Sequence, residues 1–225
     1  MISHTYFIIH PEHEPDRFTS IKTSIKSLSL TDYTIFTHTW GTDITPAIRA
    51  ELCKTDTSMQ YHGRSMNTNP LSNGEISLFL NHIECLKQIR SSYKEGLFLI
   101  LESDVLFHAD FTKKLQDVIT LGSMIDWDII NIGEGNGSDN PRGPIHPYLH
   151  LYSEKRTRCT EGLLWNYKSI CKFLDYYEST VDIDGPFDTK MDVFSEYIGS
   201  FNIYWAHPAL VYQGSIRKIF KSYLH

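Results

Sequence analysis

A continuous apolar stretch that ends in two carboxylates, LFLILESD at residues 97–104, decides the fold class of this chain. The five apolar residues that begin it are typical of a central β-strand that is buried on both faces. Glu102 and Asp104 follow one residue apart, where that strand leaves the sheet. Ligands of open α/β sheets bind outside the carboxyl ends of the strands, so we expect the functional site here.

Strand-like and helix-like segments alternate on both sides of this stretch. The clearest helix signal is the S-x-x-E capping box at residues 72–75, which apolar residues follow at three- and four-residue steps. Expected strands cover residues 6–9, 33–36, 97–101 and 127–132, and expected helices cover residues 17–30, 72–90, 111–121 and part of 163–177, with a short helix opening at Thr45 and Pro46. The alternation predicts an α/β fold: an open, Rossmann-like sheet flanked by helices, mixed near its C-terminal end, in one domain over residues 1–225.

The composition is that of an ordinary globular protein. Of the 225 residues, 41% are hydrophobic and 21% are charged, so neither disorder nor a fibrous repeat is indicated. The formal net charge of -6 gives no sign of the basic surface that binds nucleic acid, so we do not expect nucleic acid as a partner. The apolar run at residues 6–9 is too short for a signal peptide or a membrane span, so the sequence predicts a cytoplasmic protein. A homo-oligomer is left open.

Three polar segments are expected to be loops. Residues 53–73 are too many for a mere connector, and long loops of this kind often act as lids. Residues 133–147 begin with a glycine-rich GEGNG sequence, but the spacing is not G-x-G-x-x-G and two prolines prevent the helix that a dinucleotide-binding motif requires. We therefore predict a mobile loop there, and an acidic loop at residues 180–192.

The pair Glu102 and Asp104 is the strongest chemical signal. Carboxylates supply the hard oxygen ligands that Mg²⁺ and Mn²⁺ prefer. Such a cation can neutralise the negative charge that a diphosphate gains when it departs, as happens when the glycosidic bond of a nucleotide-sugar breaks. We predict that these two residues hold the cation.

Residues that follow the first two expected strands should border the nucleotide. His10 and Pro11 come directly after the first strand, and Arg17, with its fork of donors, is suited to a diphosphate. The loop after the second strand, Thr39 to Asp43, includes Gly41 and lies at the same edge of the sheet. These residues are the predicted donor-binding set.

The chain resembles glycosyltransferase family 25, which includes bacterial lipopolysaccharide glycosyltransferases and collagen galactosyltransferases. The sequence NGEI at residues 73–76 with Asn81 and His82, followed by LILESDV at residues 99–105, is similar to the family signature "GEIGCALSH … LILEDDV". Further similar stretches lie at residues 15–17, 128–130, 162–166 and 208–213. The resemblance implies a GT-A fold, a nucleotide-linked donor that is most often a UDP-sugar, manganese dependence and inversion at the anomeric carbon. Ser103 stands where the signature has its central aspartate.

The resemblance also implies roles for residues that the local pattern leaves open. His82 is expected near the donor, and Ser103 is grouped with the donor-binding residues. His207 is expected as a metal or diphosphate ligand, since a late histidine completes the metal shell in many GT-A enzymes. Asp192 matches the aspartate of the family's V-D-x-F motif and is the first candidate for the catalytic base, with Asp188 next. The implied acceptor is a hydroxyl on a glycan or a collagen-like protein.

Three classes of function remain open. The first is an inverting, UDP-sugar-dependent hexosyltransferase. The second is a GT-A-fold module that binds sugar or nucleotide without turnover, and the third is a metal-dependent phosphohydrolase or nucleotidyltransferase on a related sheet. A binding module should release no UDP from a UDP-sugar, and a phosphohydrolase should show no sugar preference.

Overall fold

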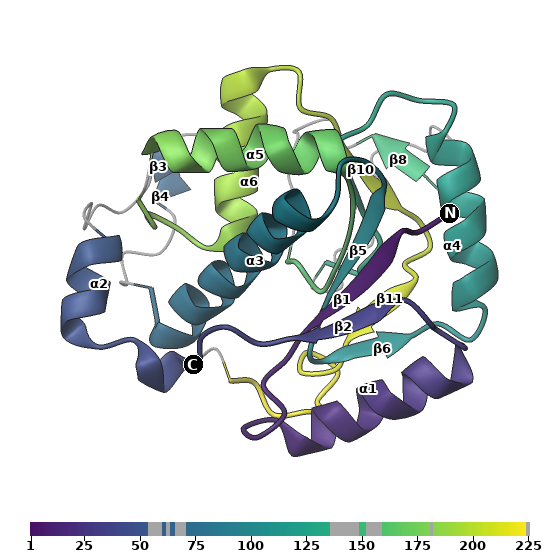
Figure 1. The fold of residues 1–225 in the computed structure, drawn as a ribbon, viewed down its shortest axis with the longest axis horizontal. Helices are drawn as coiled ribbons and strands as arrows, with labels where there is room; N and C mark the ends of the chain where they lie inside the picture. Colours follow the sequence, from purple (N-terminus) through teal and green to yellow (C-terminus); the bar gives the residue numbers. More distant parts are fainter. Residues whose placement is uncertain are drawn as a thin grey trace.

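A seven-stranded mixed sheet is the centre of the molecule (Figure 1). The computed structural model describes residues 1–53, 60–61, 64–65, 71–135, 149–151, 159–180 and 182–223. The strands, in the order in which they lie in the sheet, are β2 (Tyr33–Phe36), β1 (His4–Ile8), β5 (Leu97–Glu102), β9 (Gly162–Asn166), β7 (Ile129–Asn131), β10 (Ile203–Ala206) and β8 (Leu149–Leu151). This confirms the open, mixed α/β sheet that the alternation of strands and helices predicted.

The register of the sheet brings three strand ends to one edge. β2, β1 and β5 are parallel, and Ile8 at the end of β1 lies opposite both Phe36 of β2 and Glu102 of β5. β9 runs antiparallel to β5, with Gly162 opposite Leu101. The residues that follow β1, β2 and β5 and those that precede β9 therefore lie close together.

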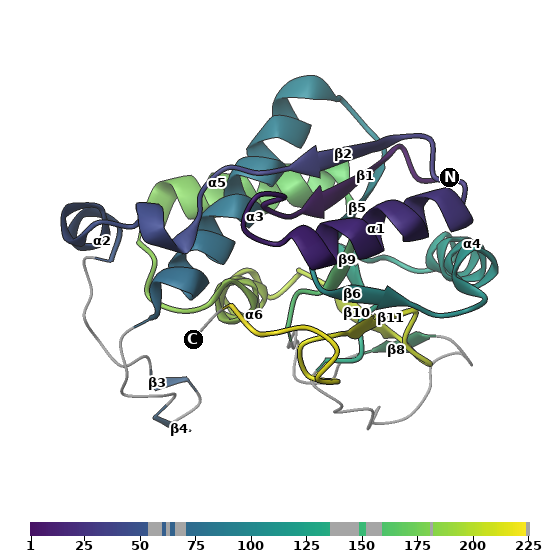
Figure 2. The same ribbon diagram turned by 90° about the horizontal axis from the view of Figure 1, so that it is seen from below.

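Helices cover both faces of this sheet, as Figures 1 and 2 show. Apolar side chains alternate across the strands, so that Tyr6, Ile8 and Ile100 belong to one hydrophobic cluster, and Phe7 and Leu101 belong to another. The first cluster packs against α3 (Asn73–Ser92), α5 (Tyr167–Thr180) and α6 (Phe187–Ile198), and the second packs against α1 (Pro15–Ser27) and α4 (Phe111–Gly122). Burial from both sides explains why β5 is apolar from Leu97 to Leu101, the residue before Glu102.

Smaller elements complete the described part of the chain. After β2 come the 3₁₀ turn η1 (Gly41–Asp43) and α2 (Pro46–Leu52), which Thr45 caps as expected. β6 (Val105–Phe107) pairs with β11 (Val211–Gln213) just beyond the acidic residues of β5. β3 (Gln60–Tyr61) and β4 (Arg64–Ser65) form a short hairpin. Most of the expected lid at residues 53–73 and nearly all of the expected mobile loop at 133–147 lie outside the described residues.

The expected loop over residues 180–192 is wrong in its second half. Helix α6 begins at Phe187, directly after Pro186, and Asp192 lies inside this helix and not in a loop. The apolar residues Phe187, Met191 and Phe194 are buried in the hydrophobic cluster that includes α3 and α5. The polar residues between them, which include Asp188 and the buried Asp192, obscure this spacing in the sequence.

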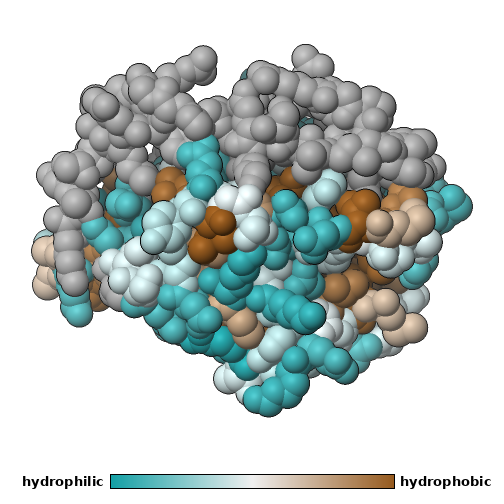
Figure 3. Space-filling view, turned by 90° about the horizontal axis from the view of Figure 1, so that it is seen from above, coloured by the Kyte–Doolittle hydropathy of each residue, from teal (hydrophilic) through white to brown (hydrophobic). Residues whose placement is uncertain are grey.

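Figure 3 shows one face of the molecule, coloured by hydropathy. On the face drawn in Figure 3, hydrophilic residues predominate among those described, and hydrophobic residues are scattered between them. In the described part of the chain, no helix is both long enough and apolar enough to cross a membrane. Isolated exposed apolar side chains such as Met124 are common on globular proteins.

Candidate active site

A pocket of about 460 Å³ lies where the carboxyl ends of β2, β1 and β5 meet. Residues that follow the three strands form one side of it, and the start of α3 and the C-terminal residues 213–223 form the others. The polar and charged residues that line it are His10, Glu14, Arg17, Thr37, Thr39, Thr42, Ser72, Asn73, Ser77, Asn81, Glu102, Ser103, Asp104, Gln213, Ser215, Lys221 and Ser222. The pocket is thus at the strand edge that the sequence predicted.

Glu102 is buried at the end of β5, and one of its oxygens is held from two sides. The Thr160 hydroxyl donates a hydrogen bond to Oε1. His82 Nε2 lies 3.4 Å from the same oxygen, and the His82 ring stacks on Phe187 with centroids 4.4 Å apart. The other oxygen, Oε2, accepts no hydrogen bond from the described residues, so it is available to a ligand.

Asp104 is also buried and is held by the C-terminal segment. Ser215 donates to Asp104 Oδ2 from its hydroxyl and, at 3.3 Å, from its backbone N–H. No described group donates to Oδ1. Burial raises the pKa of the Asp104 carboxyl, and the charge of Glu102 raises it further. A carboxylate in these surroundings would be stabilised by a nearby cation.

Arg17 connects three parts of the pocket. Its Nη1 donates to Glu14 Oε1 at 2.8 Å and to Ser103 Oγ at 2.6 Å, and its Nη2 donates to the carbonyl oxygen of Lys221. The Ser103 hydroxyl donates to Glu14 Oε1 at 2.6 Å. Glu14 Oε2 also accepts the backbone N–H of His10 at 3.0 Å. The charge of Arg17 is therefore balanced by Glu14. Its guanidinium group joins the start of α1 to Ser103 and to Lys221 near the C-terminus.

Asn81, from α3, holds the loop that follows β2. Its Oδ1 accepts the backbone N–H of His38 at 2.9 Å, and its Nδ2 donates to the Thr39 carbonyl at 2.7 Å. Ser77 Oγ donates to the same carbonyl at 2.8 Å. These bonds place Thr39 and Trp40 in the wall of the pocket.

Comparison with known proteins identifies the family. A family model described as glycosyltransferase family 25 (LPS biosynthesis protein) matches residues 3–136, which is more than half of the chain. The chain belongs to glycosyltransferase family 25. The match contains α1, α3 and the acidic motif at residues 102–104, so the expected family is confirmed.

Individual proteins similar to this chain include galactosyltransferases. Procollagen galactosyltransferase 1-A of Xenopus laevis is 27% identical over 175 residues, and procollagen galactosyltransferase 1-B of the same species is 26% identical over 175 residues. Each alignment covers 75% of this chain, which spans only 28% of the length of either relative. Among solved structures, the galactosyltransferase LgtC in complex with donor and acceptor sugar analogs is similar with a TM-score of 0.43 and 14% identity, over 90% of this chain and 72% of that one.

Most of the residues predicted for the site of this family 25 chain line the pocket. They are His10, Arg17, Thr39, Gly41, Glu102, Ser103 and Asp104. The described lining does not include Pro11, His82, Asp188, Asp192 or His207. His82 instead lies behind Glu102, as described above. His207 follows β10, and in the described part of the chain no group of three or more His, Cys, Asp or Glu side chains is arranged to hold a metal ion.

Two more buried carboxyl groups belong to the surroundings of the acidic motif. Glu161 precedes β9; its side chain accepts the Gly135 N–H at 2.8 Å, and its carbonyl accepts the Glu102 N–H at 3.1 Å. Burial raises the pKa of Glu161 to about 8, and the charges of Glu102 and Asp104 contribute to the rise. Burial also raises the pKa of Asp188, and the charge of Glu102 again contributes.

Sequence reasoning missed the pocket residues Glu14, Ser215, Lys221 and Tyr223. Glu14 carried a usable signal, since Glu14 and Arg17 stand three residues apart at the start of a helix that Pro15 marks. The other three carried none. Lys221 lies 204 residues from Arg17 in the chain, and no periodic pattern links the two.

Proposed function

We propose that the chain is a divalent-cation-dependent glycosyltransferase that moves a hexose from a UDP-sugar to an acceptor hydroxyl, with inversion at the anomeric carbon. One observation carries the proposal. Two buried carboxylates, Glu102 and Asp104, each with one oxygen that accepts no described hydrogen bond, line a pocket at the carboxyl ends of three parallel strands. Membership of glycosyltransferase family 25 supports the reaction class.

The charges around the pocket favour a donor that binds together with a cation. Among the described lining residues, the three carboxylates of Glu14, Glu102 and Asp104 outnumber the two cationic groups of Arg17 and Lys221. The pocket alone therefore repels a diphosphate. A doubly charged cation reverses the sign of the net charge, so the nucleotide and the cation should bind cooperatively.

Glu102 Oε2 and Asp104 Oδ1 are the atoms that would hold Mn²⁺ or Mg²⁺. Two carboxylates are a sufficient protein contribution, because Mg²⁺ in nucleotide sites is commonly bound by one or two carboxylates together with substrate phosphates. The cation, when bound, supplies positive charge that stabilises the departing diphosphate. Thr160 and Ser215 keep the two carboxylates in place through their other oxygens.

The names of the relatives suggest the sugar and the acceptor. Two relatives are procollagen galactosyltransferases, and the family model is described as an LPS biosynthesis protein. We therefore propose galactose as the transferred sugar, and a hydroxyl of a glycan or of a collagen-like protein as the acceptor.

A carboxylate of α6 is proposed as the base that takes the acceptor proton. Asp188 and Asp192 are four residues apart and so lie on the same side of the helix. Asp188 is the candidate that the electrostatics favour, because burial, with a contribution from the charge of Glu102, raises the pKa of its carboxyl group and so makes its carboxylate a stronger proton acceptor. In transfer with inversion, the acceptor oxygen bonds to the anomeric carbon, the bond to the diphosphate breaks, and this carboxylate receives the proton.

The proposed activity is tested by incubating the protein with UDP-galactose and Mn²⁺ and measuring UDP release. We expect slow release with Mn²⁺, none with EDTA, and faster release with a hydroxylysine-containing peptide or a lipopolysaccharide acceptor. Binding of UDP without any release would identify a binding module instead. If calorimetry with Mn²⁺ shows no UDP binding at all, the proposed function is wrong.

The proposed base is tested by Asp188→Asn and Asp192→Asn, measured separately. Loss of a general base should lower transfer by about 100-fold or more while UDP affinity stays as in the wild type. Asp188→Asn is expected to show this loss. Near-normal transfer by both variants would exclude a base on α6 and move attention to Glu161.

A further inference from the structure

The C-terminal segment Gly214–Tyr223 lies against the acidic motif. The backbone N–H of Gly214 donates to the Asp104 carbonyl at 2.8 Å, and Ser215 donates twice to the Asp104 carboxylate. A side chain at Gly214 would not fit, because a Cβ there would lie 2.9 Å from the Asp104 carbonyl oxygen. The close approach fixes the start of this segment at the pocket.

A second contact fixes the end of the same segment. Arg17 Nη2 donates to the Lys221 carbonyl, and the guanidinium carbon lies 4.7 Å from the centre of the Tyr223 ring and 5.9 Å from that of Phe220. The Tyr223 ring also contacts Trp40 edge-on, with centroids 5.7 Å apart. Lys221, Ser222 and Tyr223 thereby become part of the pocket wall.

Lys221 brings a positive charge to this wall. Its side chain is exposed, and no carboxylate in the described part of the chain forms an ion pair with it. Its ammonium lies 5.8 Å from the Tyr223 ring, a cation–π contact that leaves its hydrogen-bond donors available. The charge of Arg17, by contrast, is balanced by Glu14 at 2.8 Å. Of the two cationic residues in the described lining of the pocket, Lys221 is therefore the one able to meet an incoming anion.

We propose that Lys221 is a phosphate-binding residue of the donor site, its ammonium group contacting the diphosphate of a nucleoside diphosphate or nucleotide-sugar opposite Glu102 and Asp104. This inference rests on the proposed function, which makes the pocket a nucleotide site. It assigns a binding role to a segment that lies beyond the residues 3–136 matched by the family model. Lysine is a common phosphate ligand, and a bond between charged partners is among the stronger hydrogen bonds.

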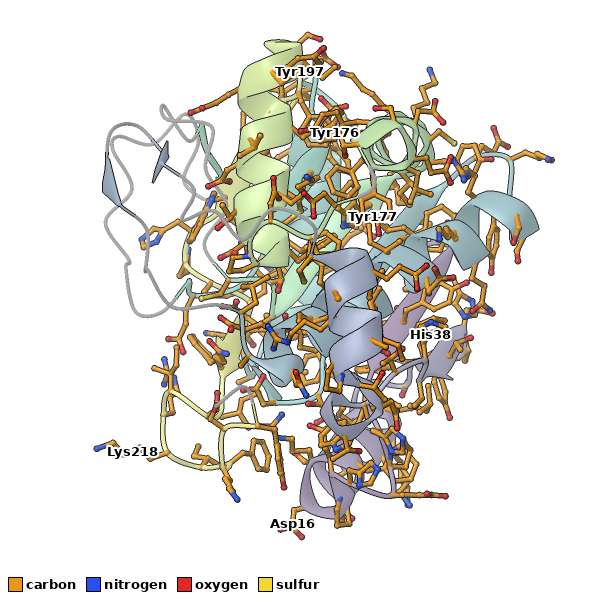
Figure 4. The ribbon with its side chains drawn as sticks, turned by 90° about the vertical axis from the view of Figure 1, so that its left-hand side faces the viewer. Asp16, His38, Tyr176, Tyr177, Tyr197 and Lys218 are labelled. Atoms are coloured by element: carbon orange, nitrogen blue, oxygen red, sulfur yellow. The ribbon has the colours of Figure 1, made fainter. Side chains whose placement is uncertain are left out.

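The test compares Lys221→Gln with Lys218→Gln in calorimetric titrations with UDP in the presence of Mn²⁺. Lys218 is the matched control, because it belongs to the same segment but extends away from the protein (Figure 4) and does not line the pocket. Lys221→Gln should weaken UDP binding by about tenfold, and Lys218→Gln should leave it unchanged. Uridine, which has no phosphates, should bind equally to wild type and Lys221→Gln.

Equal UDP affinity of wild type and Lys221→Gln would overturn the inference. So would an equal loss of uridine binding, which would mean that Lys221 only shapes the pocket. If the wild type itself binds no UDP in the presence of Mn²⁺, the proposed function is wrong, and the inference about Lys221 is wrong with it. This result can be told from the other two, because in both of those the wild type binds UDP.

A second measurement uses the wild-type protein and so does not depend on how a variant folds. Lysines are acetylated with acetic anhydride, and the rate at each lysine is followed by mass spectrometry. UDP with Mn²⁺ should slow acetylation of Lys221 severalfold and leave Lys218 unaffected. An unchanged rate at Lys221 under saturating UDP would contradict the inference.

Discussion

Ser103 is a residue at which the chain departs from the family signature. The signature has an aspartate here, whereas this chain has a hydroxyl that donates to Glu14 and accepts from Arg17. A carboxylate at this position would lie beside the buried carboxylate of Glu14, and the two like charges would repel. Ser103 instead joins Glu14 and Arg17 through hydrogen bonds beside the acidic motif.

Asp104 can be tested by a change that removes its charge and keeps its shape. Asp104→Asn should lower Mn²⁺-dependent UDP affinity by about tenfold or more, because it removes a proposed cation ligand. Its melting temperature should not fall, since burial and the charge of Glu102 already disfavour the ionised form.

Calorimetric titration with UDP and thermal denaturation, each done on wild type and on Asp104→Asn, check these two expectations. Asp16→Asn is the control, because Asp16 is an exposed carboxylate in the first turn of α1 (Figure 4). Equal UDP affinity in wild type and Asp104→Asn would reject the cation site.

Glu161 predicts a pH dependence of stability. Its pKa in the folded protein is raised to about 8, from an ordinary value of 4.5. The folded state therefore holds a proton that the unfolded state has released, and this favours folding fully below about pH 4.5 and is lost as the pH rises through 8. The contribution of Glu161 should make the free energy of unfolding fall by at most about 1.4 kcal/mol per pH unit between these values.

Glu161→Gln should remove this contribution, because an amide imitates the neutral carboxyl group. Urea denaturation at several pH values between 5 and 8, with EDTA present, should give a flatter profile for the variant than for the wild type. Glu95→Gln, at an exposed glutamate, should leave the profile unchanged. Parallel profiles for Glu161→Gln and wild type would show that Glu161 is ionised in the folded protein.

At the scale of single elements, α3 is the helix that carries most of the pocket's supporting contacts. Its capping box forms as the sequence predicts: Ser72 Oγ accepts the Glu75 N–H at 3.2 Å, and Glu75 Oε2 accepts the Ser72 N–H at 2.7 Å. Asn81 and His82, further along the helix, then reach the loop after β2 and the end of β5. The start of the helix thus sets where both side chains lie.

Removal of the cap should cost stability. Ser72→Ala is expected to lower the free energy of unfolding by about 1 kcal/mol and the melting temperature by about 2 to 4 °C, since a backbone N–H loses its acceptor. Ser91→Ala near the other end of α3, where the hydroxyl bonds only to the Gln88 carbonyl, should change stability little. Equal melting temperatures for the two variants would show that the capping box contributes nothing.

At the scale of the whole molecule, the pocket depends on contacts between the C-terminal segment and residues far from it in the sequence. Arg17 in α1 holds Lys221, and Asp104 after β5 holds Ser215. The sheet itself takes strands from His4 through Ala206, and we propose that residues 1–225 form one domain on this basis. The C-terminal segment is then a structural part of the site.

Arg17→Lys tests this connection while keeping the charge. A lysine lacks the planar fork that bonds Glu14, Ser103 and the Lys221 carbonyl together, so the C-terminal segment should open more often. Limited proteolysis with trypsin, followed by mass spectrometry, should show severalfold faster cleavage after Lys218 and Lys221.

Arg90→Lys is the matched control. In the wild type, Arg90 of α3 forms an ion pair with Glu178 of α5, away from the C-terminal segment. That variant should be cleaved in the C-terminal segment at the wild-type rate. Unchanged cleavage in Arg17→Lys would mean that other contacts hold the segment.

The sequence by itself determined the alternation of strands and helices, the buried strand β5, the capping box of α3 and the place of the acidic motif at the edge of the sheet. These features are local, because a strand, a helix start or a strand end is encoded in a few consecutive residues. Residues after three parallel strands could therefore be predicted to meet, and His10, Arg17, Thr39 and Asp104 do line one pocket.

Only the tertiary structure decided how the far end of the chain completes that pocket. The bond from Ser215 to Asp104 spans 111 residues and that from Arg17 to Lys221 spans 204, and neither leaves a periodic trace in the sequence. The start of α6 was likewise hidden, because polar residues, among them the buried Asp192, stand between its apolar ones. Local patterns report which face of an element is apolar, whereas the pairing of distant polar groups depends on the packing of the whole chain.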